Sequence, residues 1–224
     1  LIKKAEENNA SIIVLPELCI TAYTCGDLFL QQALLENAEK ALFKIAKATE
    51  KSDIISVVGL PIRYNSDLYN CGAIIQSGEI KALIPKINIP NYSEFYEARH
   101  FASGKSIKNH IISIGGQDIP FGWNYIFADK NIPELKIGIE ICEDLWVSTP
   151  PSNRLAECGA TIICNLSASD EVIGKAAYRR SLVQNQSARL VCGYIYADAG
   201  TGESTTDLIF AGHNIISENG TVLA

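Results

Sequence analysis

Short apolar runs recur along the chain and are separated by stretches richer in polar residues. Short runs that are apolar at nearly every position are typical of strands buried on both faces of a sheet. Because several of the intervening stretches show helical periodicity, the pattern predicts a layered α/β protein. The five clearest runs cover residues 12–15, 54–60, 137–141, 161–164 and 190–196.

Apolar residues at helical spacing are clearest between residues 28 and 50. They predict a helix with one buried face, for which Asp27 is the expected N-cap. Further helices are predicted at residues 152–158 and 172–189. The face of the first helix would be formed by Leu30, Leu34, Ala38, Ala41, Leu42 and Ile45.

Turn signals predict two hairpins, one at Ser77-Gly78 and one at Gly212. Residues 87–108 show no clear periodicity, which predicts a loop of a length that is often functional. The hairpin strands would cover residues 69–75 with 79–84 and residues 208–211 with 213–216, and short strands are expected at 111–114 and 125–127.

The composition limits the class of protein. The chain has 224 residues, 47% of them hydrophobic, and a net charge of −6. One sizeable domain is expected, and neither nucleic acid nor an anionic membrane is favoured as a partner. No signal peptide or long apolar span is evident. The seven cysteines form no C-x-x-C pair and the three histidines lack metal-ligand spacing. Reduced thiols, a cytoplasmic location and no metal are therefore expected.

Three of the apolar runs lead to a reactive polar residue, namely Glu17, Lys86 and Cys142. Ligands bind at the carboxyl ends of strands in α/β sheets, so the three residues could share one pocket. A carboxylate can take the proton of a thiol, and an ammonium can stabilise the negative charge of an attacked carbonyl. The three groups together would suit acyl transfer. The alternative is that each residue has an ordinary role: Cys142 as a small buried hydrophobic residue, Glu17 as a solvated loop acid and Lys86 as a surface lysine.

Longer strings surround these positions: LPELC at 15–19, YTCGDLF at 23–29, KINIPNY at 86–92, EFYE at 94–97, CEDLW at 142–146 and NLSAS at 165–169. On these strings the chain resembles the glutamine-hydrolysing domains of the glutamine-dependent NAD synthetases, a branch of the nitrilase superfamily. The resemblance covers essentially the whole chain. Agreement at four separated sites is too specific for chance.

The resemblance implies an α-β-β-α sandwich with two central mixed sheets and helices outside. It implies glutamine amide hydrolysis through a glutamyl thioester, with Cys142 as nucleophile, Glu17 as general base and Lys86 as the third catalytic residue. It also implies a homo-oligomer, and no metal or cofactor in this domain. The side chains expected near the glutamine are Tyr23, Tyr92, Glu143, Trp146, Ser169 and Lys175.

Two departures from the family pattern change the expectation. Lys175 stands where arginine is expected, so a bidentate carboxylate contact would become a point contact. The S-G-G-x-D-S loop of the synthetase half is missing from the sequence. Residues 1–224 are therefore expected to be one carbon-nitrogen hydrolase (glutaminase) domain, truncated at both ends. In the longer enzyme, a synthetase domain would use ATP, magnesium and the released ammonia to amidate deamido-NAD.

Two alternatives stay open. One is a stand-alone amidase or nitrilase that acts on another small amide. The other is a non-catalytic assembly module.

Overall fold

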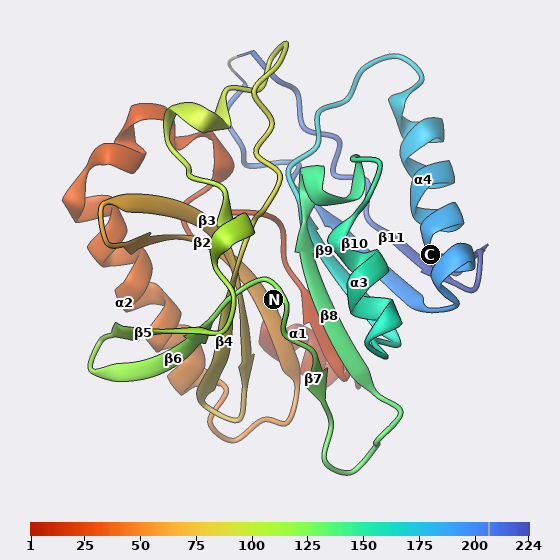
Figure 1. Cartoon of the computed structure of the whole chain (residues 1–224), viewed down its shortest axis with the longest axis horizontal. Helices are drawn as coiled ribbons and strands as arrows, with labels where there is room; N and C mark the ends of the chain where they lie inside the picture. Colours follow the sequence, from red (N-terminus) through yellow and green to blue (C-terminus); the bar gives the residue numbers. More distant parts are fainter. Residues whose placement is uncertain (206) are drawn as a thin grey trace.

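Two mixed six-stranded sheets face each other in the computed structural model, which describes residues 1–205 and 207–224 (Figure 1). In the first sheet β1 is parallel to β2 and β4 is parallel to β6, whereas the other neighbours are antiparallel. Its strands in spatial order are β1 (Ile12–Val14), β2 (Ile55–Tyr64), β3 (Asp67–Gln76), β4 (Glu79–Pro85), β6 (Gln117–Phe121) and β5 (His110–Ile114).

The second sheet has a parallel centre of β8, β9 and β10, flanked by antiparallel strands on both sides. Its strands in spatial order are β12 (Thr221–Val222), β11 (Ile215–Glu218), β10 (Gly193–Asp198), β9 (Ile162–Ser167), β8 (Lys136–Ile141) and β7 (Phe127–Ala128).

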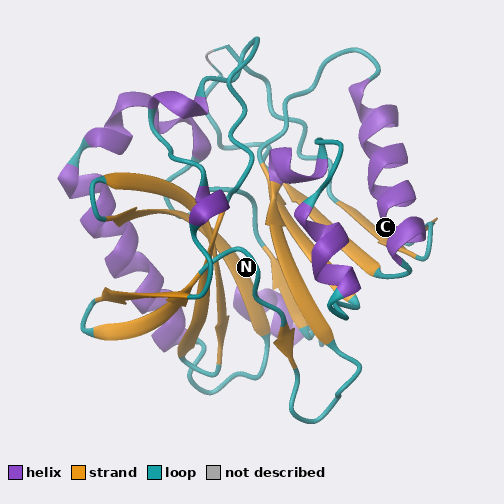
Figure 2. Cartoon of the chain, in the orientation of Figure 1, coloured by secondary structure: helices purple, strands orange, loops and turns teal. Residues whose placement is uncertain are grey.

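Helices cover the outer face of each sheet (Figure 2). Helix α2 (Gln32–Ala48) packs on the first sheet, and α3 (Pro151–Glu157) and α4 (Lys175–Leu190) pack on the second. The predicted α-β-β-α sandwich with two mixed sheets is thus confirmed. The remaining helical segments are α1 (Ile2–Glu7), η1 (Tyr23–Leu30), η2 (Glu97–Arg99), η3 (Gly104–Ser106) and η4 (Cys142–Leu145). None of the helices formed by the described residues has the length and hydropathy needed to cross a bilayer.

The layered packing explains why the strand sequences are apolar at successive positions. Ile74, Ile139 and Leu166 lie in a core between the two sheets. On β2, Val57 faces that core, whereas its neighbour Val58 lies in the core beneath α2. Successive side chains of a strand point to opposite faces, and here both faces are buried. The apolar runs follow from this double burial.

The start of the first long helix was predicted wrongly. Helix α2 begins at Gln32 with Gln31 as its N-cap residue, and Asp27 lies inside the 3₁₀ segment η1. Gly26 interrupts η1 with a left-handed φ of +54°, a conformation that glycine adopts without steric cost. The Asp27 carboxylate instead accepts hydrogen bonds from Arg99. The predicted face changes accordingly, since Leu30 is exposed.

The buried face of α2 consists of Leu35, Ala38, Leu42 and Ala46. It shares two residues with the predicted face, which also included Leu34, Ala41 and Ile45; these three are partly buried. The helical period was therefore right and the face was rotated slightly.

The predicted hairpin at Gly212 is also wrong. Residues 208–211 form no strand, although Phe210 makes an isolated bridge with Asp170. Strand β11 pairs instead with β10 and with β12 across the Asn219-Gly220 turn. The alternation of apolar residues gave no information on which distant strand would be the partner.

The other predicted elements are present with shifted ends: the strand expected at 125–127 overlaps β7 only at Phe127, and the strand expected at 190–196 begins at Gly193. The hairpin of β3 and β4 turns at Ser77-Gly78 as predicted. The loop of residues 87–108 contains only the short segments η2 and η3. Strand β6 was not predicted; its run of Gln117–Phe121 contains Pro120, a residue that is unfavourable inside a sheet.

Candidate active site

Cys142 is the first residue after β8 and the first residue of η4. It has a left-handed φ of +45°, and its side chain is buried. Its backbone N–H donates a hydrogen bond of 3.1 Å to Asn165 Oδ1 on the neighbouring strand β9. The chain turns sharply here, which places the thiol at the carboxyl end of the parallel strands.

Glu17 and Lys86 meet at the corresponding edge of the first sheet. Glu17 follows β1 and Lys86 follows β4. Pairing through β2 and β3 makes these two strands parallel, so their carboxyl ends lie at the same edge. Lys86 Nζ lies 2.6 Å from Glu17 Oε1, and both side chains are fully buried. Asn70 Nδ2 donates to the same oxygen at 2.6 Å.

Glu97 is a site residue that the sequence analysis did not single out. It lies on η2, and its Oε1 is 2.7 Å from Lys86 Nζ with the side chain 5% exposed. Tyr23 donates its hydroxyl hydrogen to the same oxygen at 2.8 Å. The one available signal was its place in the EFYE string of a long aromatic loop. Lys86 is thus held between two buried carboxylates.

Burial and the excess of negative charge perturb the pKa values of this group. Burial and the nearby charge of Glu97 together raise the pKa of Glu17 to about 7, although Lys86 opposes the rise. Burial alone would lower the pKa of Lys86, but Glu17 and Glu97 outweigh it and hold that pKa well above its ordinary value. Lys86 therefore stays charged near neutral pH, and Glu17 exchanges a proton in that range.

The thiol of Cys142 lies close enough to this group for its charges to act on it. Burial raises the pKa of Cys142 well above its ordinary value, Glu17 and Glu97 add to the rise, and Lys86 opposes it. The resting thiol is therefore neutral and needs a base before it can attack. Among the described residues Glu17 Oε2 has no hydrogen-bond partner, so this oxygen is available to accept the proton.

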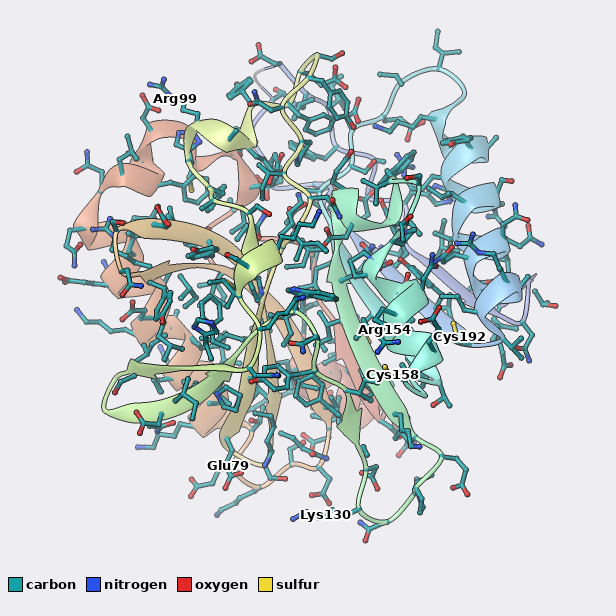
Figure 3. The ribbon with its side chains drawn as sticks, in the orientation of Figure 1. Glu79, Arg99, Lys130, Arg154, Cys158 and Cys192 are labelled. Carbon is teal, nitrogen blue, oxygen red and sulfur yellow. The ribbon has the colours of Figure 1, made fainter. Side chains whose placement is uncertain are left out.

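The other six cysteines lie in different surroundings, and Cys19 and Cys25 are partly buried against apolar clusters. Cys71 and Cys164 are buried in apolar cores, where burial raises their pKa values. Cys158 is exposed after α3, and Cys192 lies near α4 (Figure 3). The sulfur that shares a site with the Glu17–Lys86 pair belongs to Cys142.

Two predicted substrate residues lie on the loop side of the thiol. Tyr92 donates its hydroxyl hydrogen to Glu143 Oε2 at 2.9 Å. Burial raises the pKa of Tyr92, and the negative charges of Glu143 and Cys142 add to the rise. Burial and then Glu97 raise the pKa of Tyr23, and the negative charge of Cys142 adds to this rise as well. An aromatic cavity of about 170 Å³ borders Tyr23 and Glu97.

The other predicted substrate residues lie on the side of α4. Lys175, the first residue of α4, lies 5.2 Å from the Trp146 ring centroid and 5.5 Å from that of Phe95. Its ammonium also pairs with Asp170. These contacts hold a cation against two aromatic rings. Burial raises the pKa of Glu143, and Lys175 is one of the groups that oppose this rise.

Ser169 is buried, and both its hydroxyl and its backbone N–H form hydrogen bonds within the protein. Its hydroxyl accepts a hydrogen bond of 3.2 Å from Arg179 Nη2, and its backbone N–H donates to Asp198 Oδ1 at 2.7 Å. Arg179 is a fully buried arginine one helical turn after Lys175 that the sequence analysis did not identify. It reaches Ser169 from the neighbouring turn of the helix.

No group of three or more His, Cys, Asp and Glu side chains suited to a metal ion is present within residues 1–205 and 207–224. What the site does hold is a thiol, two carboxylates and an ammonium. A thiol that attacks a carbonyl carbon needs this combination of base and positive charge.

An α-β-β-α sandwich with a thiol, a carboxylate and an ammonium at its strand ends defines the nitrilase-like class of hydrolases. The family model described as "Carbon-nitrogen hydrolase" matches residues 1–224. The chain belongs to this family.

Similar proteins agree with this assignment. The chain is 41% identical over 224 residues to the glutamine-dependent NAD(+) synthetase of Mycobacterium tuberculosis (strain ATCC 25618 / H37Rv), covering 99% of this chain and 32% of that protein. It is 32% identical to the corresponding enzyme of Aquifex aeolicus (strain VF5) over 92% of this chain and 32% of that one. The chain thus spans about a third of the length of these relatives.

Solved structures give the same picture. The glutamine-dependent NAD(+) synthetase from Cytophaga hutchinsonii superposes with a TM-score of 0.88 at 33% identity, covering 100% of this chain and 36% of that one. An amidase from Nesterenkonia sp. has a TM-score of 0.74 at 18% identity, covering 98% of this chain and 74% of that one, and shares the fold.

Proposed function

We propose that this chain hydrolyses the side-chain amide of L-glutamine and releases ammonia. The observation that supports this most directly is the contact of 2.6 Å between the buried Glu17 carboxylate and the Lys86 ammonium, next to the Cys142 thiol. Burying two charged groups costs free energy, which their mutual attraction repays only in part. Because both side chains are fully buried, the alternatives of a solvated acid and a surface lysine do not suit this site.

In the proposed reaction Glu17 accepts the proton of the Cys142 thiol as the sulfur bonds to the amide carbon. Lys86 stabilises the negative charge that develops on the amide oxygen. Glu17 then gives its proton to the leaving nitrogen, the carbon–nitrogen bond breaks, and ammonia leaves. Water attacks the glutamyl thioester with Glu17 again as base, which releases glutamate and restores the thiol.

Recognition of the glutamine backbone is proposed to fall to groups around the thiol. Glu143, held by Tyr92, offers a carboxylate for the α-ammonium group. Lys175 offers a charge for the α-carboxylate, as a point contact in place of the bidentate contact of an arginine. Tyr23, Trp146 and Ser169 complete the set of proposed substrate-binding side chains.

The names of the relatives support a use for the ammonia. They are glutamine-dependent NAD(+) synthetases, and this chain corresponds to about a third of their length. We infer that residues 1–224 are the glutaminase domain of such an enzyme. Its synthetase domain would use ATP and magnesium to amidate deamido-NAD. A homo-oligomer and a cytoplasmic location belong to the same proposal.

The test is ammonia release from L-glutamine by the purified chain. We expect the parent and the matched variant Cys158→Ala to release ammonia, and Cys142→Ala to release none, because Cys158 is exposed and lies outside the site. Equal rates for the parent and Cys142→Ala would contradict the assignment of the nucleophile.

The same assay separates the alternatives. Turnover of a simple aliphatic amide such as propionamide, with no turnover of glutamine, would favour a stand-alone amidase. Light scattering that shows an oligomer, combined with no ammonia from either amide, would favour an assembly module.

A further inference from the structure

The turn that presents Cys142 requires support from its neighbours. Its φ of +45° is left-handed, a region that residues with a Cβ atom occupy unfavourably. Two side chains hold the backbone on either side of this turn. Asn165 Oδ1 binds the N–H of Cys142 at 3.1 Å, and Asp144 Oδ2 binds the N–H of Ile141 at 3.0 Å.

The second oxygen of Asp144 reaches the other catalytic segment. Asp144 Oδ1 accepts one hydrogen bond of 2.8 Å from the backbone N–H of Asn88 and another of 2.8 Å from Asn88 Nδ2. Asn88 follows Lys86 by two residues on the loop that leaves the first sheet. One carboxylate therefore connects the turn of the nucleophile in the second sheet to the segment of Lys86 in the first.

The surroundings of Asp144 show that this bridge is not incidental. Its side chain is buried, and within the described part of the chain it forms no salt bridge. A buried carboxylate without an ion-pair partner is unfavourable, and hydrogen bonds from N–H donors compensate it. Within the described residues its hydrogen-bond donors belong to Ile141, next to Cys142, and to Asn88, two residues after Lys86.

We propose that Asp144 is a positioning residue for the amide hydrolysis, one that sets the place of the Cys142 thiol relative to the Lys86 ammonium. This inference rests on the proposed function for its kinetic consequences. Asp144 acts through the backbone, since its two oxygens bind the segments that carry Cys142 and Lys86 and are already occupied there. Sub-ångström placement of reacting groups has large effects on rate.

The test uses Asp144→Asn, which keeps the size of the side chain. An amide supplies one acceptor oxygen and one NH₂ donor, so whichever way it turns, the NH₂ faces either Ile141 N–H or the Asn88 donors. One side of the bridge is lost. We expect kcat for ammonia release to fall by about 10- to 100-fold, with KM changed less than about twofold.

A second readout follows Cys142 without glutamine. Alkylation of Cys142 by iodoacetamide, measured by peptide mass spectrometry, is expected to slow by a similar factor in Asp144→Asn. Asn88→Ala removes one of the three hydrogen bonds and leaves the backbone bond, so a smaller loss of about 3- to 10-fold is expected. The double variant should lose less than the product of the two single losses, because both report the same bridge.

The matched control is Thr49→Val, which removes the buried hydrogen bond from Thr49 Oγ1 to Ala46 O (2.8 Å), outside the site. It should leave kcat, KM and the alkylation rate at parent values, whatever it does to the melting temperature. A folded Asp144→Asn that alkylates Cys142 at the parent rate would overturn the proposal. If that variant does not fold, parent values of kcat and alkylation rate in Asn88→Ala would overturn it. Absence of glutamine turnover in the parent would instead contradict the proposed function, and the alkylation comparison would still decide the role of Asp144.

Discussion

Lys86 is a buried ammonium held between the carboxylates of Glu17 and Glu97. Two carboxylates and one ammonium leave a net negative charge in a buried site, so one acid is readily protonated. Burial and Glu97 raise the pKa of Glu17 to about 7 in spite of Lys86. A general base works best when its pKa lies near the operating pH. Residue by residue, the site is arranged for proton transfer near neutrality.

The proposed base predicts the pH dependence of the reaction. Glu17 must be deprotonated to accept the thiol proton, and burial raises its pKa to about 7. The rate of ammonia release should therefore rise with pH and reach half its plateau near pH 7. Stopped assays between pH 5 and 9 would measure this. In Glu17→Gln the plateau should fall by at least about 100-fold, and retention of the parent profile in that variant would exclude Glu17 as the base.

At the scale of elements, close backbone packing places the segment that carries Glu17. Gly59 of β2 lies against the turn that follows β1, and its carbonyl accepts the N–H of Ile20 at 3.0 Å. A Cβ atom at Gly59 would lie 2.3 Å from the backbone nitrogen of Leu18 and 2.9 Å from the carbonyl carbon of Glu17. Backbone atoms cannot move aside as a flexible side chain can. The missing side chain of Gly59 thus helps to set the position of Glu17.

Gly59→Ala should push this turn outward and reduce activity. We expect a loss of about 1–3 kcal/mol in the free energy of unfolding, as for other overpacked cores, and a fall in kcat. Gly193→Ala is the matched control, because Gly193 also lies in a strand, β10, and its Cβ would make ordinary contacts at 3.5 Å. Urea unfolding and the ammonia assay measure both. Equal losses in the two variants would contradict this role for Gly59.

At the scale of the whole molecule, the two sheets share one apolar core and bury several acids near the carboxyl ends of their strands. Burial raises the pKa of Glu17 and of Asp144 to about 7, and that of Asp198 to about 6. An acid with a higher pKa in the folded state binds more protons when folded than when unfolded between the two pKa values. The contribution of each group to stability is complete below about pH 4 and is lost as the pH rises through 6–7.

The melting temperature should therefore fall between pH 5 and pH 8. Burial lowers the pKa of His213, and this group acts in the opposite direction. It is outnumbered by the three acids above, to which Glu140 and Glu143 add, since burial raises their pKa values as well. Differential scanning calorimetry would measure the slope, and Asp198→Asn should reduce it by removing one of the three acids. A melting temperature that rises across this range would show that the folded protein does not raise the pKa values of these acids.

The sequence alone determined the layers, the family and the identity of the main chemical groups. Apolar runs and turn residues are local signals, and double burial in a sandwich makes them strong, as at β2, β8 and β9. The LPELC, KINIPNY and CEDLW strings carried the resemblance. The start of α2 and the pairing of β11 were wrong, because a kink at Gly26 and the choice of a distant strand depend on packing rather than on local pattern.

Only the tertiary structure decided how the groups meet. Glu17 and Lys86 are separated by 69 positions in the chain, and their carboxylate and ammonium are in contact. The only signals for Glu97 and Asp144 were their places in the EFYE and CEDLW strings, because an acid in a loop and an acid after a strand are usually solvated. Their burial, their hydrogen bonds and the raised pKa of Glu17 arise when the ends of β1, β4 and β8 are brought to one edge. Charge interactions depend on the distance between the groups and on the exclusion of solvent around them, and the amino-acid sequence does not give either quantity directly.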